Sequence, residues 1–437
     1  MKSEIKDRIE QIRHGNVPEG YKKTKTDIVP VEWEEHPIGR FICEYTEKTT
    51  EPNQYPVLTS ARTGLMLQTD YYTNRQVTTE DNVGYNVLPY GYITFRSRSD
   101  DGHFRFNENR LIKRGIISYF YPVFSFSEEV CHGYMLQLLN QSIYHRMYPY
   151  VEGTAQQVLS LKKLGQLIYS LPPFGEQKKI AEILTTQDKV IELEQQRIEE
   201  IKKVKKFFLS KMFPKKGQAV PEIRFKGFTD AWEQRKFDEV FDCTIPNNTL
   251  SRAELNYESG SVRNIHYGDI LIKYGSVVDV QNDEIPFVTG KSSDDFKGAL
   301  LQDGDIIIAD TAEDETTGKA CEIGNSQGLD VVSGLHTMVC RPRNKMALGY
   351  LGYYLNSDAY HHQLLPLMQG IKVLSLSRTN VQKTMVCYPK SKTEQQLIAD
   401  CFRNLDNLIT LHQRKLEEEK QKKKALMQLL LTGIVRV

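Results

Sequence analysis

The feature of this sequence that most constrains its fold is an internal duplication. When the chain is shifted against itself by 218 residues, Glu176-Gln-Lys-Lys-Ile-Ala-Glu aligns with Glu394-Gln-Gln-Leu-Ile-Ala-Asp. The match continues without a gap to Lys205-Lys206 and Lys423-Lys424. A repeat of this length indicates a repeated structural unit. We therefore expect the 437 residues to fold as two copies of one unit, within the two to four domains that this length suggests.

Weaker landmarks recur in the same order along both halves. They are Trp33-Glu34 with Trp232-Glu233, Leu88-x-x-Gly91-x-Ile93 with Leu301-x-x-Gly304-x-Ile306, and Val158-Leu-Ser-Leu161 with Val373-Leu-Ser-Leu376. Their offsets differ modestly, as loop insertions would make them. The two copies are thus similar in their second part and diverged in their first.

The similar part is predicted to be one long helix in each copy. Residues 176–212 and 394–431 contain no Gly or Pro and carry apolar residues at spacings of three and four. A helix of this length is roughly 55 Å long, too long to bury its apolar stripe in one small domain. We expect the two helices to pair antiparallel, because that relates the halves by a pseudo-two-fold axis. In the alternative, each helix packs separately on its own domain. The residues predicted for the helix interface, or for a partner interface, are Ile180, Ile183, Val190, Ile198, Ile201, Ile398, Phe402, Leu405, Leu408 and Leu416.

The diverged parts are predicted to be globular. They hold most of the aromatic residues and glycines, and short β-type runs such as residues 91–95, 116–121, 305–309 and 336–340. The predicted fold class is α+β, with two mixed α/β domains separated by a long antiparallel two-helix coiled coil. The expected divisions are 1–30, 31–171, 172–216, 217–388 and 389–437.

Composition excludes several classes of protein. The chain has 57 Lys+Arg against 56 Asp+Glu, so it is not a uniformly basic protein that coats nucleic acid. No run approaches the roughly 18 apolar residues of a membrane span, and the charged start, residues 1–13, lacks the apolar core of a signal peptide. We therefore expect a cytoplasmic protein without membrane contact. The seven cysteines form no C-x-x-C pair, so neither a disulfide framework nor a zinc site is indicated.

Two segments of the sequence partly match catalytic motifs, but neither match is complete. Ser170-Leu-Pro-Pro-Phe174 imitates the motif of amine methyltransferases, yet Leu171 stands where a polar residue must bind the target amine. Gly290-Lys291-Ser292 resembles the end of a P-loop, but position 285 is Ile rather than the first Gly. The pairs His361-His362 and Cys131-His132 lack the spacing of metal ligands. We expect no catalysis and no metal site in this chain.

Taken together, these residues carry a family likeness. A diverged domain, Val-Leu-Ser-Leu, Pro, Glu-Gln-x-x-Ile-Ala and a long helix occur twice, and the chain ends in Leu430-Leu-Thr-Gly-Ile-Val-Arg-Val437. This order closely resembles the specificity (S) subunit of type I restriction-modification systems, over essentially the whole chain. The resemblance implies two target-recognition domains, 31–171 and 217–388, that each read half of a bipartite sequence in double-stranded DNA. It also implies that the helices set the domain spacing and hold two methyltransferase (M) subunits.

The resemblance places the chemistry in partner subunits. The M subunits bind S-adenosylmethionine and methylate adenine, and restriction (R) subunits use ATP and Mg and cut DNA; no cofactor is expected in this chain. Two rivals stay open: a non-enzymatic coiled-coil module that binds proteins, and a recognition subunit of a related methyltransferase or nuclease system.

Side chains that read bases are expected on loops that reach the groove of DNA, and Arg96-Ser-Arg98 directly follows a predicted strand. The candidates are Arg62, Arg75, Arg96, Arg98, His103, Arg105, Arg252, Arg263, Lys273, Lys291 and Arg378. The N-terminal segment contains Arg8-Ile-Glu-Gln-Ile12, which is similar to Arg197-Ile-Glu-Glu-Ile201. We expect residues 1–30 to pack with the C-terminal region, 389–437.

Overall fold

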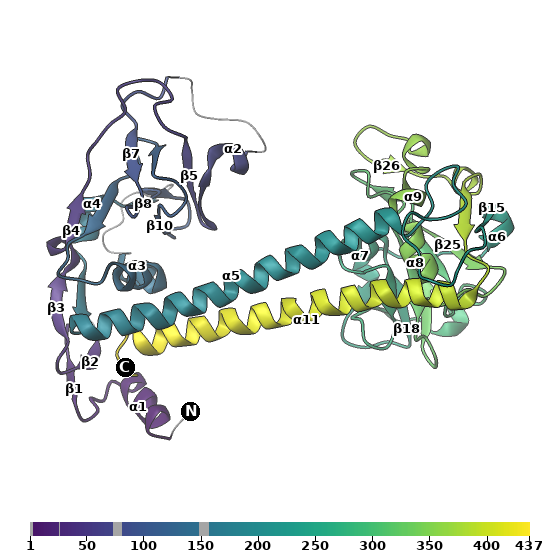
Figure 1. Ribbon diagram of the computed structural model, residues 1–437. Coiled ribbons are helices and arrows are strands. Elements are labelled where there is room, and N and C mark those ends of the chain that lie inside the picture. Colours follow the sequence, from purple (N-terminus) through teal and green to yellow (C-terminus); the bar gives the residue numbers. More distant parts are fainter. Residues whose placement is uncertain (1–2, 26, 73–80, 148–156) are drawn as a thin grey trace. The chain divides into compact units, whose positions relative to one another are not determined.

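A computed structural model describes residues 3–25, 27–72, 81–147 and 157–437. The chain divides into two compact units, unit 1 with residues 1–194 and 415–437, and unit 2 with residues 195–414. The two long helices, α5 (Phe174–Lys211) and α11 (Lys392–Leu430), each contribute residues to both units (Figure 1). The sequence-based division treated each helix as a region of its own, whereas the structure shares each helix between the units.

Unit 1 is a mixed α/β unit built around a four-stranded sheet of order β10-β8-β12-β4. Its core includes Phe95, Phe106 and Phe124 from this sheet, together with Ile180 and Leu184 of α5. The elements before α5 are α1 (Ser3–Arg13), β1 (Tyr21–Lys23), β2 (Ile28–Pro30), β3 (Glu34–Pro37), β4 (Ile42–Glu44), β5 (Leu58–Ala61), β6 (Gly64–Leu67), α2 (Gln68–Tyr71), β7 (Asn86–Pro89), β8 (Ile93–Phe95), β9 (Arg98–Ser99), β10 (Phe106–Glu108), β11 (Arg114–Ile117), β12 (Val123–Phe126), α3 (His132–Met147), β13 (Gln157–Val158), α4 (Leu161–Gly165) and β14 (Ile168–Leu171).

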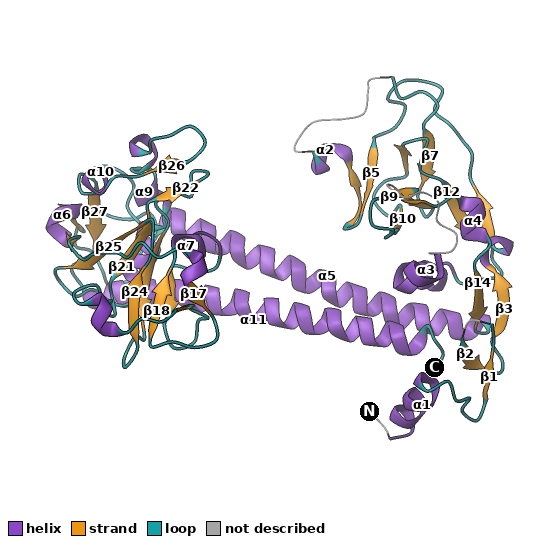
Figure 2. Cartoon of the chain, turned by 180° about the vertical axis from the view of Figure 1, so that it is seen from behind, coloured by secondary structure: helices purple, strands orange, loops and turns teal. Residues whose placement is uncertain are grey.

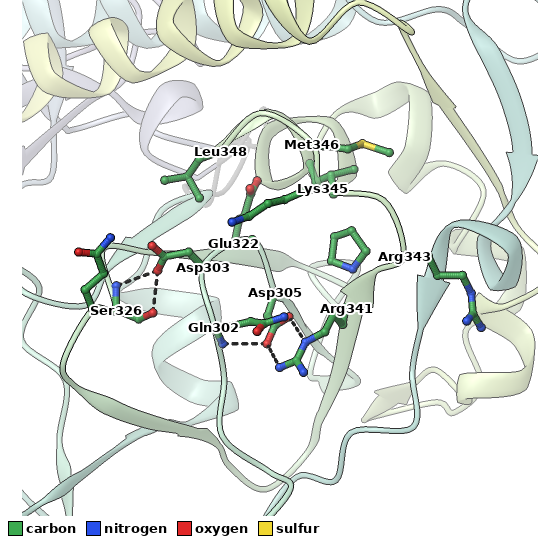
Figure 3. A pocket seen from close by; sticks show the side chains of 14 residues that line it. Gln302, Asp303, Asp305, Glu322, Ser326, Arg341, Arg343, Lys345, Met346 and Leu348 are labelled. Carbon is green, nitrogen blue, oxygen red and sulfur yellow. Dashed lines mark hydrogen bonds and ion pairs between the residues drawn. The ribbon is translucent and has the colours of Figure 1, made fainter.

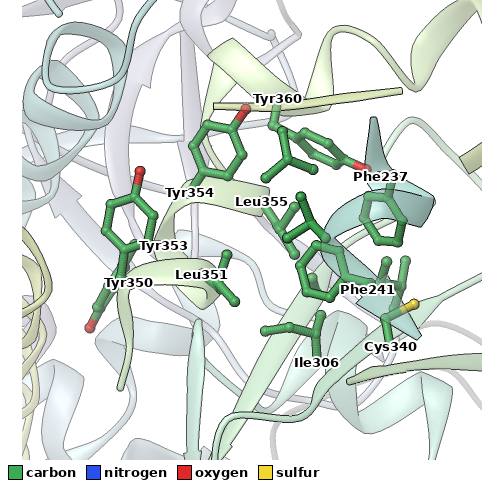
Figure 4. Close-up of a cluster of buried hydrophobic side chains, with 14 of the residues drawn as sticks. Phe237, Phe241, Ile306, Cys340, Tyr350, Leu351, Tyr353, Tyr354, Leu355 and Tyr360 are labelled. Atoms are coloured by element: carbon green, nitrogen blue, oxygen red, sulfur yellow. The ribbon is translucent and has the colours of Figure 1, made fainter. Parts of the chain in front are cut away.

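Unit 2 contains a five-stranded sheet, β16-β25-β21-β23-β19, and a four-stranded sheet, β17-β20-β18-β24 (Figure 2). Aromatic residues dominate its largest core cluster, where Phe237, Phe241, Tyr354 and Tyr360 surround Leu355 (Figure 4). The elements before α11 are β15 (Glu233–Lys236), α6 (Phe237–Val240), β16 (Phe241–Asp242), β17 (Leu255–Asn256), β18 (Val262–Ile265), α7 (Tyr267–Ile272), β19 (Val277–Asp279), β20 (Phe287–Val288), β21 (Ile306–Ala309), β22 (Thr311–Ala312), β23 (Ala320–Gly324), β24 (Asp330–Ser333), β25 (Thr337–Pro342), α8 (Tyr350–Leu355), α9 (Asp358–His361), β26 (Leu374–Ser375), α10 (Arg378–Val381) and β27 (Met385–Tyr388).

The predicted α+β fold, the duplication and the two long helices are confirmed. The observed helices begin and end within two residues of the predicted ranges, 176–212 and 394–431. In both copies a two-stranded antiparallel ladder leads into the helix: β14 pairs with β3, and β27 pairs with β15. The repeated Trp-Glu dipeptide lies at the start of β3 and β15, which explains why this landmark recurs.

The repeated Glu-Gln dipeptide anchors the start of each helix to its unit. Gln177 donates to the carbonyl of Pro172 and accepts from the backbone N–H of Cys131. Gln395, its equivalent, donates to the carbonyl of Pro389 and accepts from the N–H of Ala347. Buried polar groups must be hydrogen-bonded, and in each copy the glutamine satisfies one backbone carbonyl and one backbone N–H at equivalent positions.

The glutamates of this dipeptide form equivalent buried ion pairs. Arg436 donates two hydrogen bonds to Glu176, at 2.6 and 2.8 Å, in unit 1. Arg224 donates two to Glu394, at 2.7 and 2.9 Å, in unit 2, where the Trp232 indole N–H also donates to Glu394. Bidentate arginine–carboxylate pairs fix orientation as well as adding energy. The start of each long helix is therefore held by an arginine that follows the C-terminal end of the other long helix.

Repeated ion pairs also join the helices to each other. Asp188 pairs with Lys423 in unit 1, and the equivalent Asp406 pairs with Lys205 in unit 2. In unit 1, Glu194 pairs with Lys415, so residue numbers rise along α5 as they fall along α11. The two helices are therefore antiparallel within unit 1. Four lysines of the helices, Lys202, Lys205, Lys422 and Lys423, are ion-paired with carboxylates of the helices.

The predicted helix-interface residues fall into three groups. Ile180, Ile398 and Phe402 are fully buried and belong to the cores of the units, because the start of each helix packs on its own globular part. Ile198 is buried and Ile183, Val190, Ile201, Leu405 and Leu416 are half-buried. Leu408 is exposed, so its side chain is not enclosed by the helices.

The N-terminal segment contacts the last residues of the chain. Arg8 donates to the carbonyl of Ile434 at 2.7 Å, and the Tyr21 hydroxyl donates to the carbonyl of Gly433 at 2.7 Å. Gly433 has a φ of 74°, and a Cβ at this position would lie 2.5 Å from Pro30. A glycine is therefore needed where the chain leaves α11 and passes under the N-terminal segment.

One strand prediction was wrong. The run 116–121 was expected to be a strand, but β11 ends at Ile117 and residues 118–121 form a turn before β12. The β-branched and aromatic residues of this run satisfy strand propensity, yet tertiary structure overrides it.

Candidate nucleic-acid interface

Three of the arginines predicted for the first domain lie at one end of the four-stranded sheet. Arg96 and Arg98 follow the last residue of β8, as the sequence predicted. Phe106 of β10 pairs with Phe95 of β8, so the antiparallel register places Arg105 opposite Arg96. Three cations are thereby collected near one sheet end: Arg96 follows β8, Arg98 begins β9 and Arg105 precedes β10.

A carboxylate connects Arg62 and His103 on the neighbouring loop. Asp101 accepts a hydrogen bond from Arg62 at 2.6 Å and lies 3.4 Å from the His103 ring nitrogen. The Ser99 hydroxyl and the His103 backbone N–H also donate to Asp101. The hydrogen bond from Arg62, followed by those from His103 and Ser99, holds the pKa of Asp101 well below its usual range. The loop is therefore organised around a fixed negative charge.

The arginines at the sheet end differ in how they are held. The Arg98 guanidinium lies 4.8 Å from the centre of the exposed Phe120 ring, a cation–π contact. Arg96 is exposed and makes no hydrogen bond or ion pair with any residue that the structure describes. Arg105 interacts electrostatically with Asp188 of α5. Arg75 lies outside the described residues.

Most of the cations predicted for the second domain are held by groups of unit 2. Arg252 donates to both oxygens of Asp269, at 2.9 and 2.7 Å. Arg263 donates to the carbonyl of Val280 and lies over the Phe287 ring. Lys273 pairs with Glu284 at 2.7 Å. Their positions are thus explained without a ligand.

Two of the cations predicted for the second domain are exposed and make no ion pair with a described residue. The exposed Lys291 lies 5.7 Å from the Phe296 ring centre. Arg378 is the first residue of α10, follows the N-cap Ser377, and is exposed without a hydrogen bond or ion pair to any described residue. Of the five predictions in this domain, these two fit a surface contact best.

Sequence reasoning missed two aromatic residues of the first domain. Tyr119 and Phe120 are large, exposed and in ring contact, and Arg98 lies over Phe120, yet the run that contains them was interpreted as a strand. The missed signal was Ser118, a polar residue that interrupts the apolar run where the turn begins.

A cavity of about 650 Å³ lies in unit 2 beside β23 and β25 (Figure 3). Arg341 donates to both oxygens of the buried Asp305, and burial raises the pKa of Glu322 to about 7 although backbone N–H groups of α8 and the residue before it bind its carboxylate. The carboxylates Asp303, Asp305 and Glu322 of the cavity are engaged with protein donors, so these residues suggest a structural role.

Among the described residues, no three His, Cys, Asp or Glu side chains gather in a group that could bind a metal ion. Within the same residues, no helix is long and apolar enough to cross a membrane.

Comparison with known proteins gives concordant matches. The profile described as type I restriction modification DNA specificity domain matches residues 30–203 and 229–421, once in each copy. The MjaVIII specificity subunit of a type I restriction enzyme from Methanocaldococcus jannaschii is 25% identical over 296 residues, which are 65% of this chain and 66% of that protein. A putative MjaX specificity subunit from the same organism is 24% identical over 321 residues, 70% of this chain and 68% of that protein.

Solved structures share the fold. The S subunit of a type I restriction-modification system from M. genitalium has a TM-score of 0.52 at 14% identity, covering 94% of this chain and 97% of that chain. A chain from a study of complex assembly and conformational transition of the type I R-M system has a TM-score of 0.54 at 15% identity, covering 93% and 99%.

Proposed function

Since the chain belongs to the type I restriction-modification DNA specificity family, we propose that it is the DNA-recognition subunit of a type I restriction-modification complex. The observation that carries the proposal is the family match to both copies of the duplicated unit. In this proposal each globular part reads one half of a bipartite target in double-stranded DNA.

The anchors and the globular parts support an asymmetric target. The helix anchors are equivalent in the two copies, whereas the sheets differ in strand number and order. Equivalent anchors would present the two parts to DNA in related ways, because the DNA backbone itself has approximate two-fold symmetry. Unlike surfaces would then read unlike half-sites, separated by bases that are not read.

The helices are proposed to set the distance between the half-sites. A helix of 38 residues, the length of α5, is about 57 Å long. Groove centres on one side of DNA recur every 34–36 Å or so, which is on the same scale. Two paired helices would therefore serve as a spacer between the parts that contact DNA.

The helix surfaces support a pair of identical partners. Leu193 and Leu411, which are equivalent in the duplication, are 63% and 59% exposed. Exposed leucines repeated by the duplication would suit two copies of one protein, which we propose to be the M subunit. The proposal assigns S-adenosylmethionine to M, ATP and Mg to the R subunits, and no catalytic step to this chain.

The test is methylome sequencing of a host with and without the gene, alongside its M subunit. We expect a bipartite methylated motif that disappears with the gene. Leu193→Glu and Leu411→Glu should each remove one of two M subunits from the purified complex, whereas Leu397→Glu, at another exposed helix position, should remove neither. Methyl transfer by the pure chain alone, or a motif that persists without the gene, would contradict the proposal.

A further inference from the structure

Two aromatic side chains stand exposed on a turn of unit 1. The Tyr121 N–H donates to the carbonyl of Ser118 at 2.9 Å, which closes a β-turn between β11 and β12. Tyr119 and Phe120, the central residues, are 55% and 45% exposed, and their ring centres lie 4.1 Å apart. Leaving two large rings in water forgoes stabilisation by burial, so the pair is a candidate binding element.

The backbone of this turn is held from two sides. The buried Asn86 donates to the carbonyl of Tyr121 at 2.6 Å, and its side-chain oxygen accepts from the Lys48 ammonium. The Ser97 hydroxyl donates to the carbonyl of Phe120 at 2.7 Å. Because the turn is fixed before any ligand arrives, binding through its rings loses little backbone entropy.

Cations interleave with the rings. Arg98 lies over Phe120, and Arg96, two residues earlier, makes no hydrogen bond or ion pair with any described residue. The register places Arg96 beside the turn, because Thr94 of β8 pairs with Val123 of β12. Exposed rings combined with a cation that has no ion pair are the chemistry by which proteins stack on nucleobases and contact the phosphate backbone.

A cavity of about 820 Å³ adjoins the turn. Tyr119 and Phe120 line it together with Lys48 and Lys162, and among its described lining residues Glu44 is the single carboxylate. The cavity is within the size range of sites that take small planar ligands. Its charge favours a nucleic acid over a cationic ligand.

We propose that the Tyr119–Phe120 turn is a base-stacking element of the first recognition domain. Its rings stack on a base that is unstacked in the first half-site, Arg98 braces Phe120, and Arg96 contacts the DNA backbone. The inference rests on the proposed function, and it names an element that reads DNA by shape and stacking rather than by hydrogen bonds to base edges.

The experiment uses the full chain with its M subunits and a duplex that carries the methylated motif. 2-Aminopurine is placed at each position of the first half-site in turn, because its fluorescence rises when the base unstacks. Wild-type complex should raise the fluorescence at one or two positions besides the adenine that the M subunit methylates, since a methyltransferase unstacks its own target base. Tyr119→Ala with Phe120→Ala should abolish the rise and weaken binding by about 5- to 100-fold. The salt dependence of binding should stay unchanged, since no charge is removed.

Matched variants separate stacking from general damage. Tyr119→Phe with Phe120→Tyr should restore both signals, because the rings are kept. Tyr90→Ala should leave both unchanged. Tyr90 is 52% exposed with Arg110 over its ring at 5.4 Å, but it lies at the other end of the β7–β11 ladder, in which Pro89 pairs with Arg114.

The outcomes distinguish the inference from the proposed function. Retained fluorescence and affinity in the double variant overturn the inference while leaving the proposed function intact. Loss of M subunits from the double variant with normal DNA binding also overturns it, and indicates a protein contact instead. Failure of the wild-type complex to bind its motif overturns the proposed function itself. If the double variant still methylates a target with an altered first half-site, but not one with an altered second half-site, the variant is folded.

Discussion

Replacing Arg224 by Met should strongly destabilise unit 2, because it leaves the Glu394 carboxylate buried without its cation. The Glu394 side chain is 2% exposed and the Arg224 side chain 14%, so neither is well solvated. Removing one partner of a buried ion pair costs about 3–5 kcal/mol. We expect about 3 kcal/mol, the lower end, because the Trp232 indole still donates to Glu394.

The chain offers a direct assay for this loss. It has two tryptophans, Trp33 in unit 1 and Trp232 in unit 2, so a Trp33→Phe background makes fluorescence report unit 2 alone. Urea is preferred to guanidinium, which would screen the ion pair. With a slope of about 3 kcal/mol per molar urea, the midpoint should fall by about 1 M.

Two controls set the scale of the measurement. Arg235→Met removes an exposed pair with Glu233 in the same unit and should cost little stability, because surface ion pairs contribute little. Replacing Glu394 by Gln in the Arg224→Met chain should recover part of the loss, since no buried charge is left. If Arg224→Met costs no more than Arg235→Met, the buried pair does not anchor α11 and the reasoning fails.

Three further predictions follow from the same structure. Burial raises the pKa of Glu322 to about 7 from an ordinary value near 4.5. The stability that protonated Glu322 contributes, about 3 kcal/mol, is therefore present below about pH 4.5 and is lost as the pH rises through 7. Urea midpoints of unit 2 should fall between pH 5 and 8, and Glu322→Gln should flatten that fall. Removing residues 1–25 deletes the Arg8 and Tyr21 contacts to the C-terminal segment, so normal assembly of the truncated chain with M subunits in size-exclusion chromatography would count against a structural role for this segment. Arg96→Ala should weaken binding to all DNA sequences about equally in binding titrations, as the loss of a backbone contact would, whereas a loss of about 1–3 kcal/mol at one half-site only would show that Arg96 reads a base instead.

The sequence alone determined the architecture, because the spacing of its apolar residues is periodic and the segment that carries this spacing is repeated. Helical spacing persists over nearly forty residues without Gly or Pro, and the same pattern occurs a second time 218 residues later. Both helices were predicted to within two residues for this reason. The same repeat singled out Glu176-Gln177 and Glu394-Gln395, although not what they bind.

The tertiary structure decided which side chains are available at the surface. Sequence could not distinguish Arg96, which makes no hydrogen bond or ion pair with a described residue, from Arg252, which Asp269 holds by two hydrogen bonds from 17 positions away. It also could not separate the exposed Tyr119 and Phe120 from core aromatics such as Phe124. Ion pairing and burial depend on contacts between residues distant in the chain, and no local pattern of residue types encodes those contacts. Periodicity therefore determined the scaffold, and long-range packing determined the surface that can meet DNA.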